Sequence, residues 1–343
     1  MSEDITIYDI AKDLGVSPTT VSRALNDHPA VNANTKKRIY DRAGQLGYRF
    51  NVFASSLRSK RTNNVGVIVP RLNSSFQSSV LAGMEKVANE AGLNLIISQS
   101  LESFEKEIAN VKTMYKSRVD GLLVSLAEKT TSYDHFKPFL DKKIPVLFFD
   151  RVASGLGCTG VVIDNTQAGY DATAHLLAQG CTRIAHVLGN PAVNVYADRL
   201  KGYRYALMDQ GIAFDPELVL HSAFTEEAID AIVDWVMQRN PKVTGLFVSN
   251  DSAAASCIRI LKKRGLRIPQ DIAVVGFNNE IISRLIEPNL TTTNYPGFEM
   301  GEVAMRNLVN HLDGQSDGLL QKTNMITLRS ELIIRESSLW HPG

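Results

Sequence analysis

The residues whose types and spacing best suit a chemical role first occur close to the amino terminus. Ser17 supplies a hydroxyl cap, and Pro18 follows at the first helical position, where its missing N–H costs nothing, so a short helix is expected to begin there. A step of 100° per residue places three apolar residues on the buried side of this helix, namely Val21, Ala24 and Leu25. The outward side then carries Pro18, Thr19, Ser22 and Arg23, a surface that could hydrogen-bond to the edges of bases.

Two further helices would hold this one in place. A hydroxyl cap at Thr6 with Asp9 three residues later begins an amphipathic helix that ends at Gly15. A third helix is capped by Asn32 and ends near Gly47, with its basic residues outside: Lys36, Lys37, Arg38 and Arg42. Two short helices joined by a tight glycine turn form a helix-turn-helix, whose second helix enters the major groove, so Pro18, Thr19 and Arg23 would face bases.

Basic charge is concentrated in this part of the chain. The net charge is only +1, but residues 14–61 hold nine Lys and Arg against Asp27 and Asp41, which gives +7 and leaves −6 for the rest. A basic segment on a mildly acidic body is typical of a DNA-binding head. The alternative is a solvated basic helix bundle with no nucleic-acid role.

Three runs in this head form a specific pattern: Ile7-Tyr8-Asp9-Ile10-Ala11, the run from Gly15 to Asn26, and Leu46-Gly47-Tyr48. Together they resemble the lactose and galactose repressor family of transcription regulators. The resemblance implies a helix-turn-helix DNA-binding domain over residues 1–49. With the helix geometry it suggests these DNA-contacting residues: Thr6, Tyr8, Ser17, Pro18, Thr19, Thr20, Ser22, Arg23 and Asn26.

In that family the next segment, here residues 50–62, is a hinge that folds into a helix on DNA. Three residues stand where the hinge residues of the family would fall, namely Asn51, Ala54 and Leu57. Leu57 would be the apolar wedge in the minor groove, since such a side chain can kink the duplex between base pairs. Phe50 and Ser55 replace a proline and an arginine that are common there, so a plain polar linker is the alternative.

From Val65 onward, short apolar runs alternate with helical patterns that end at glycines. Seven of these runs predict buried parallel strands, four in a first sheet and three in a second: residues 65–69, 95–97, 121–124 and 146–149, then 184–188, 245–248 and 272–275. Two doubly wound lobes are therefore expected. Ligands in such sheets bind at the carboxyl ends of the strands, where polar residues follow several of these runs.

This body resembles the periplasmic-binding-protein fold that the same family uses. The expected fold class is a small all-α helix-turn-helix head plus hinge, followed by an α/β two-lobed periplasmic-binding-protein-like domain with two doubly wound parallel sheets. By the resemblance the chain crosses between lobes near residues 162–165, 290–294 and 325–327. The effector-binding and dimerisation domain would then cover residues 63–343, with lobe 1 at about 63–162 and 294–325, and lobe 2 at about 163–293 and 326–343.

The resemblance also implies an effector pocket between the lobes. The matching positions are Phe76, Asp150, Arg151, Arg199, Phe224, Asn250, Asp251 and Asn278. Asp150 and Arg199 could each engage adjacent hydroxyls in a fork, and an aromatic side chain could cover an apolar ring face, as a sugar, a related polyol or a nucleoside would require. The alternative is structural: the aromatic residues could belong to the core, and the Asp and Asn residues could cap helices.

Asn278 departs from the aspartate that is most common at its place in the family. It removes a negative charge that would face the ligand, so a bound anion or a sugar phosphate becomes a hypothesis. Ligand-panel calorimetry on the wild type and Asn278→Asp would test it, and an unchanged preference would defeat it.

Other classes of protein fit the sequence less well. A transport or chemotaxis binding protein would carry a secretion signal, which the acidic start does not resemble, and no apolar run approaches the roughly 18 residues of a membrane span, so a cytoplasmic location is expected. An enzyme is not expected, because no phosphate-cradling glycine loop follows Val69 or Leu188 and neither a nucleophile arrangement nor a metal-type histidine spacing stands out. No cofactor or metal is therefore expected, and the three cysteines fit neither a disulfide framework nor a zinc knuckle.

The sequence thus predicts a DNA-binding regulator, expected to be a repressor, whose operator affinity depends on a small ligand. No heptad tail follows the last apolar run, so a homodimer on a two-fold symmetric operator is expected. Whether the ligand releases DNA or promotes its binding stays open. A sensor lobe that meets another protein in place of a ligand is a further alternative.

Overall fold

The computed structural model describes residues 5–48, 61–314 and 325–339, and the chain divides into two compact units, Met1–Thr62 and Asn63–Gly343. Within residues 5–48 of the first unit the structure describes three helices: α1 (Ile7–Leu14), α2 (Pro18–Leu25) and α3 (Ala33–Gln45). Each of them begins at a capping residue that the sequence predicts. The Asp9 carboxylate accepts hydrogen bonds from the Thr6 backbone and hydroxyl, while Ser17 and Asn32 accept from the third residue of the helix that each precedes.

The turn between α1 and α2 depends on one glycine. Gly15 has φ 63°, a left-handed conformation that a side chain would disfavour, and this lets the chain reverse directly after α1. The three helices then enclose a small core of fully or nearly buried side chains: Ile10, Ala11, Val21, Ala24, Ile39 and Ala43. Of the three positions of α2 that the helical periodicity predicts to face inward, Val21 and Ala24 are buried and Leu25 is half-buried, so the opposite side of α2 is left outward.

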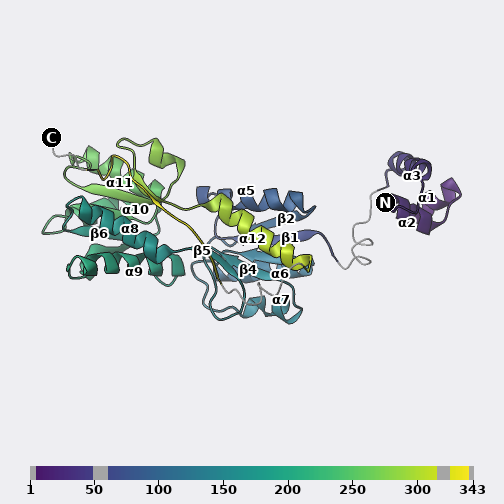
Figure 1. Ribbon diagram of the computed structural model, residues 1–343, viewed down its shortest axis with the longest axis horizontal. Helices are drawn as coiled ribbons and strands as arrows, with labels where there is room; N and C mark the ends of the chain where they lie inside the picture. Colours follow the sequence, from purple (N-terminus) through teal and green to yellow (C-terminus); the bar gives the residue numbers. More distant parts are fainter. Residues whose placement is uncertain (1–4, 49–60, 315–324, 340–343) are drawn as a thin grey trace. The chain divides into compact units, whose positions relative to one another are not determined.

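The second unit contains two six-stranded sheets (Figure 1). The first has the order β11-β5-β4-β3-β1-β2, and all of its pairings are parallel. Its strands are β1 (Asn64–Val69), β2 (Asn94–Gln99), β3 (Gly121–Val124), β4 (Val146–Phe149), β5 (Gly160–Ile163) and β11 (Met325–Leu328). The helices of this lobe are α5 (Ser75–Glu90), α6 (Phe104–Lys116), η1 (Asp134–Phe136), α7 (Lys137–Asp141) and α12 (Gly297–Leu312).

The second sheet has the order β12-β10-β9-β8-β6-β7, parallel throughout except for the antiparallel pair of β12 with β10. Its strands are β6 (Ile184–Leu188), β7 (Val219–His221), β8 (Gly245–Val248), β9 (Ala273–Asn278), β10 (Thr291–Asn294) and β12 (Leu332–Ile333). Its helices are α8 (Asn165–Ala178), α9 (Asn194–Asp209), η2 (Pro216–Leu218), α10 (Glu226–Met237), α11 (Asp251–Lys263) and η3 (Ile281–Arg284). The expected fold class, a helical head followed by two α/β lobes of parallel sheets, is confirmed.

The chain passes between the two sheets three times, after β5, after β10 and after β11. The third passage differs from the expectation near residues 325–327, because β11 pairs with β5 along its whole length, up to Leu328. The segment 326–328 therefore belongs to the first lobe, not to the second. This boundary is set by the hydrogen bonds between β11 and β5, which the local residue pattern does not predict.

One predicted strand is less buried than the sequence indicates. β2 is the edge strand of the first sheet, and its residues are partly or fully exposed, with Ile97 42% exposed. A continuous apolar run predicts a strand covered on both faces. Here the run lies at an open edge, so its apolar side chains reach the surface.

Paired glycines let two helices approach closely in each lobe. In the first lobe α12 lies along α5 (Figure 1), and a Cβ atom at Gly301 would stand 2.0 Å from the Val80 carbonyl oxygen. In the second lobe α8 packs against α9, and a Cβ at Gly202 would stand 2.0 Å from the Thr166 oxygen. These contacts between backbones fix the helix ends that border the junction of the lobes.

Candidate functional sites: the second helix and the cleft between the lobes

The outward side of α2 presents a compact set of polar side chains. Thr19, Arg23 and Asn26 are exposed, and Pro18, Thr20 and Ser22 are half-buried. Within the part of the head that the structure describes, neither the Thr19 nor the Arg23 side chain has a hydrogen bond or an ion pair to another residue. Both are therefore available to an external partner.

Other predicted DNA-contacting residues already have an internal role. Ser17 accepts from the Thr20 backbone N–H at 3.0 Å and lies 2.9 Å from the Thr20 hydroxyl, so both side chains help to hold the first turn of α2. The Asn26 amide donates to the Ser22 carbonyl at 2.7 Å and closes the other end of the helix. On α1, Thr6 is exposed and tied to Asp9, while Tyr8 is 68% exposed.

Two of the basic residues of α3 are paired inside the head. Lys36 forms an ion pair with Asp27, and Arg42 forms one with Asp13. They tie α3 to the turn after α2 and to α1, whereas Lys37 and Arg38 are exposed. The expected hinge residues Asn51, Ala54 and Leu57, as well as Phe50 and Ser55, lie outside the described residues.

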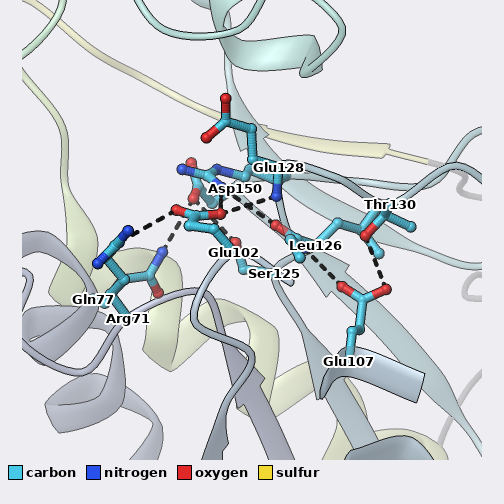
Figure 2. Close-up of polar contacts among 11 residues, drawn as sticks. Arg71, Gln77, Glu102, Glu107, Ser125, Leu126, Glu128, Thr130 and Asp150 are labelled. Atoms are coloured by element: carbon cyan, nitrogen blue, oxygen red, sulfur yellow. Dashed lines mark hydrogen bonds and ion pairs between the residues drawn. The ribbon is translucent and has the colours of Figure 1, made fainter. Parts of the chain in front are cut away.

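In the second unit, Asp150 lies at the centre of the polar contacts at the carboxyl end of the first sheet (Figure 2). It follows β4 with φ 60° and is 5% exposed. Its Oδ2 atom accepts hydrogen bonds from Gln77 at 3.2 Å and Ser125 at 3.1 Å, and its Oδ1 accepts one from the Tyr295 hydroxyl at 2.6 Å. Three donors of the chain itself therefore already contact the carboxylate.

Arg151, the next residue, faces a carboxylate of its own. Its guanidinium donates to Glu102 at 2.7 Å, and Glu102 also accepts from the Glu128 backbone N–H at 2.9 Å and lies 3.9 Å from Arg71 (Figure 2). The positive charge of Arg151 is therefore balanced locally. Glu102 is a site residue that the sequence analysis misses, because its partner lies 49 residues away in the chain.

A second buried carboxylate, Glu107, fixes the loop that follows β3. It is fully buried, accepts from the Ala127 N–H at 2.7 Å and the Thr130 hydroxyl at 3.0 Å, and lies 3.0 Å from His135 Nε2 (Figure 2). Glu107 and Glu102 thus both hold the loop that follows β3, and Ser125 at the start of this loop contacts Asp150.

In the second lobe, Arg199 of α9 is 3% exposed. Its Nε donates to the Asn165 side chain at 2.9 Å, its Nη1 donates to the Ser249 carbonyl at 3.3 Å, and its Cζ lies 3.5 Å from the centre of the Phe277 ring. Burial lowers the pKa of Arg199 from its ordinary value, although the guanidinium stays charged. Asn165, at the first passage between the lobes, is a further residue that the sequence analysis misses.

Asn250 and Asp251 have the structural roles that the sequence analysis kept as the alternative. Asn250 caps α11 by accepting from the Ala253 N–H at 2.9 Å. Asp251 is fully buried and accepts from the Thr292 hydroxyl at 2.7 Å and the Glu280 backbone N–H at 2.8 Å. Burial raises the pKa of Asp251 to about 7, against the opposing effect of the Thr292 hydrogen bond. Asp251 thus holds the loop after β9.

A hollow of about 460 Å³ lies where the first turns of α5 and α12 meet the loop after β9. Among the predicted ligand residues, Phe76 and Asn278 line it, together with Tyr295 from the second passage between the lobes. Asn278 has φ 117° and donates its amide to Glu280 at 3.3 Å. Asp150, Arg151 and Arg199 do not line this hollow, but Tyr295, which does, donates its hydroxyl to Asp150.

Phe224 lies elsewhere. It lines a separate hollow of about 330 Å³ between α10 and α11, with Asp230, Ser256 and Arg259 among its neighbours. The structure therefore brings Phe76, Asp150, Arg199 and Asn278 to the junction of the lobes, and Phe224 is linked to Arg199 through Tyr196, whose ring lies 6.3 Å from the Phe224 ring and 5.6 Å from Arg199 Cζ. Asn194 of α9, which donates to the Asp150 carbonyl at 3.3 Å, joins them there although no sequence motif indicates it.

Two properties of the described residues are relevant to membrane insertion and to metal binding. No helix among residues 5–48, 61–314 and 325–339 has the length and apolar character needed to cross a bilayer. Over the same ranges, no cluster of three or more His, Cys, Asp or Glu side chains has the arrangement of a metal site.

Comparison with known proteins agrees with both units. Residues 6–51 match the family described as bacterial regulatory proteins of the lacI family, and residues 173–338 match the periplasmic binding protein-like domain. The HTH-type transcriptional regulator RegA of Clostridium saccharobutylicum is 33% identical over 335 residues, which cover 97% of this chain and 99% of RegA.

Two solved structures have the same fold. The complex of the transcriptional regulator CelR with cellobiose has a TM-score of 0.71 at 27% identity and covers 97% of this chain and 99% of its own. The lac repressor dimer bound to operator and the anti-inducer ONPF has a TM-score of 0.86 at 23% identity and covers 98% and 100%. Together with the geometry of the head and the two lobes, the relationship to RegA shows that the chain belongs to the lacI family of DNA-binding transcriptional regulators, which carry a ligand-binding domain and are not enzymes.

Proposed function

We propose that this chain acts in the cytoplasm as a homodimeric repressor. In this proposal α2 reads the major groove of a two-fold symmetric operator, and an uncharged sugar, related polyol or nucleoside bound between the lobes controls the affinity for DNA. The observation that carries the proposal is the outward side of α2. Thr19 and Arg23 are exposed and without internal partners among the described residues, on a helix that is capped at both ends.

The geometry of α2 suits a reading helix. Val21 and Ala24 are fully buried, so the helix cannot rotate without disrupting the core of the head. Arg23 can form a bidentate contact with guanine, while Thr19 offers a hydroxyl and a methyl group. Thr6, Ser17 and the exposed basic residues of α3 would then contact phosphates, and Asn51, Ala54 and Leu57 are proposed to reach the minor groove.

The chemistry at the junction of the lobes favours an uncharged ligand with several hydroxyl groups. Arg151 is balanced by Glu102, and the Arg199 guanidinium already donates to the Asn165 side chain and the Ser249 carbonyl while it lies over the Phe277 ring. Asp150 is an acceptor for hydroxyl groups, and Phe76 offers an apolar ring face. CelR, whose structure holds cellobiose, has the same fold, which supports a carbohydrate.

Two features support a homodimer. The lac repressor of similar fold was solved as a dimer on its operator. In this chain, the open edge at β2 carries exposed apolar side chains on and around the strand, namely Leu72, Ile97, Leu101 and Ile108. Exposed apolar edges of this kind are candidates for burial against a second copy.

Control by a ligand follows from linkage. A ligand that binds one arrangement of the lobes more tightly shifts the population toward it, and the affinities for ligand and operator must then change reciprocally. Whether the ligand lowers or raises the affinity for the operator depends on which arrangement of the lobes the dimer uses on DNA. The ligand therefore either releases the repressor from DNA or acts as a corepressor.

Selection of bound duplexes from a random pool, with and without a panel of sugars and nucleosides, tests the proposal. We expect an approximately palindromic consensus whose recovery changes with one class of ligand. Arg23→Ala should lose about 1–3 kcal/mol of preference for that consensus over random DNA. Arg204→Ala, which removes the same charge from the sensor unit, should retain it. A wild-type protein with no sequence preference at ordinary ionic strength would refute the proposal.

A further inference from the structure

Tyr295 occupies an unusual place in the second unit. It follows β10, at the passage from the second sheet to α12 of the first lobe, and it is 6% exposed. Its ring is stacked on Phe76 of the first lobe, with centroids 4.2 Å apart and an interplanar angle of 12°. It also meets Phe277 of the second lobe edge to face at 5.9 Å. One aromatic ring therefore packs against both lobes.

The Tyr295 hydroxyl completes the hydrogen bonding of Asp150. Its O–H donates to Oδ1 at 2.6 Å, while Gln77 and Ser125 donate to Oδ2. Burial raises the pKa of Tyr295 well above its usual value, and the nearby Asp150 raises it further, so the phenol keeps its proton and remains a donor. A hydrogen bond from a neutral donor to a buried carboxylate is among the stronger kinds in proteins.

The same ring separates the open hollow from the Asp150 carboxylate. Tyr295 lines the hollow of about 460 Å³, whereas Asp150 does not. A molecule that enters the hollow therefore meets the Tyr295 ring before it can reach Asp150. Beyond the ring, Asn194 of the second lobe donates to the Asp150 carbonyl at 3.3 Å and accepts from the Val152 N–H at 3.3 Å, which holds the two lobes together.

We propose that Tyr295 is a specificity-determining residue of the effector site, because its phenol takes the place at Asp150 that a ligand hydroxyl would need. Tyr295 closes the junction of the lobes without a ligand, and an effector binds only if one of its own hydroxyl groups replaces the phenol at Oδ1. This inference rests on the proposed function, in which the junction of the lobes binds an effector. Ring stacking by Phe76 and Phe277 would then favour an effector with a flat or ring-shaped body beside that hydroxyl.

The first test needs neither DNA nor effector, so its failure is distinct from a failure of the proposed function. Amide hydrogen exchange would be compared in the full-length wild type, Tyr295→Phe and Tyr203→Phe. Tyr203 is a matched control: it is also buried and its hydroxyl donates to the Ile184 carbonyl at 2.8 Å, but both partners lie within the second lobe.

Tyr295→Phe keeps the ring and removes only the hydroxyl. Exchange of the Val152 amide, whose acceptor is Asn194 of the other lobe, should accelerate about tenfold, the factor expected when a hydrogen bond to a carboxylate is lost. Tyr203→Phe should leave that amide near the wild-type rate. Equal rates at Val152 in the wild type and Tyr295→Phe would overturn the proposal.

The second test asks whether an external hydroxyl can take over. Tyr295→Ala leaves a space between Phe76 and Phe277 that matches a phenol molecule, and phenol is the probe. Added phenol should restore slow exchange at Val152, and benzene, which has the same ring without the hydroxyl, should restore less of it. Equal rescue by both probes would mean that the ring alone closes the lobes and would overturn the assignment of the hydroxyl. If Tyr295→Ala does not fold, the comparison of Val152 exchange between the wild type and Tyr295→Phe still tests the role of the hydroxyl.

Discussion

The guanidinium of Arg199 lies over the ring of Phe277, with Cζ 3.5 Å from the ring centre. Arg199 comes from α9 and Phe277 from β9, so the contact joins a helix and a strand of the second lobe at the junction with the first. The same guanidinium reaches Asn165 and the Ser249 carbonyl. It is therefore a structural centre of the second lobe as well as a candidate for contact with a ligand.

Arg199→Lys tests this centre. Lysine keeps the charge but cannot lie flat on the ring while donating to two acceptors, so we expect a loss of about 2 kcal/mol in the free energy of unfolding of the second unit. Urea unfolding followed by circular dichroism would measure it. Arg204→Lys is the control, since Arg204 lies 4.0 Å from the Phe214 ring but is exposed, and it should change stability by less than about 0.5 kcal/mol. Similar losses in both variants would contradict the structural role of Arg199.

The buried carboxyl of Asp251 predicts a specific dependence of stability on pH. Burial raises the pKa of Asp251 to about 7 in the folded chain, above its usual 3.8. The folded state then holds the proton more tightly than the unfolded state between about pH 4 and 7, so stability should fall as the pH rises through that window, by roughly 4 kcal/mol at most.

Asp251→Asn resembles the protonated carboxyl. Its oxygen can accept from the Glu280 N–H, and its amide can donate to the Thr292 hydroxyl, so the variant should lose this pH dependence and be more stable than the wild type at pH 8. His186 acts in the opposite direction, because burial lowers its pKa to about 3 in the folded chain, so only the unfolded state binds the proton as the pH falls below about 6.5 and stability falls with it; this effect is present in both proteins. Parallel stability curves for the two proteins between pH 4 and 8 would contradict the prediction.

The close crossing of α5 and α12 depends on Gly301. A Cβ there would stand 2.0 Å from the Val80 carbonyl oxygen, which belongs to the backbone and cannot rotate away. Gly301→Ala should therefore separate the two helices and cost about 3 kcal/mol or more. Thermal unfolding would measure the loss.

Gly121→Ala provides a graded control in the same lobe. A Cβ at Gly121 would stand 2.7 Å from Leu308 Cδ1, the far end of a side chain that can adopt another rotamer. The melting temperature should fall less than in Gly301→Ala. The reverse order would mean that the helices can part more easily than the side chain can move.

The sequence predicts those features of the fold and of the site that depend on neighbouring residues in the chain. The helix caps at Ser17 and Asn32 and the glycine turn at Gly15 are local, and the structure confirms them. The sequence analysis does not predict β10, because Thr291–Asn294 is polar and is a strand through its pairing with β9 and β12. Tyr295 directly follows β10, so a sequence analysis that does not predict the strand does not indicate Tyr295 as a site residue either.

Distant pairing also decides the roles of the charged residues. Polar side chains after buried strands are candidates for ligand contact, and Asp150 and Asp251 fit that rule equally well in the sequence. In the structure, Asp150 lies at the junction of the lobes while Asp251 is turned inward to Thr292, 41 residues away. Local sequence carries no information about this difference.

Ser17 has two candidate roles, as the cap of α2 and as a contact for a DNA phosphate. Its hydroxyl accepts from the Thr20 N–H and holds the start of α2, and it is also a candidate for contact with a phosphate. Ser17→Ala removes both and should lower the free energy of unfolding of the head by about 1 kcal/mol. Asn32→Ala, which removes the equivalent cap of α3, should cost a similar amount.

Ser17→Asp keeps the cap, because a carboxylate at this place also accepts the Thr20 N–H and interacts favourably with the helix dipole. It places a negative charge where the proposal puts a phosphate, so stability should stay near the wild type while affinity for duplex DNA falls at least tenfold at low salt. Thermal unfolding and fluorescence anisotropy on a labelled duplex would measure the two effects. If Ser17→Asp binds DNA as the wild type does, Ser17 is a capping residue alone, and α2 must approach the duplex with its first turn turned away from the phosphates.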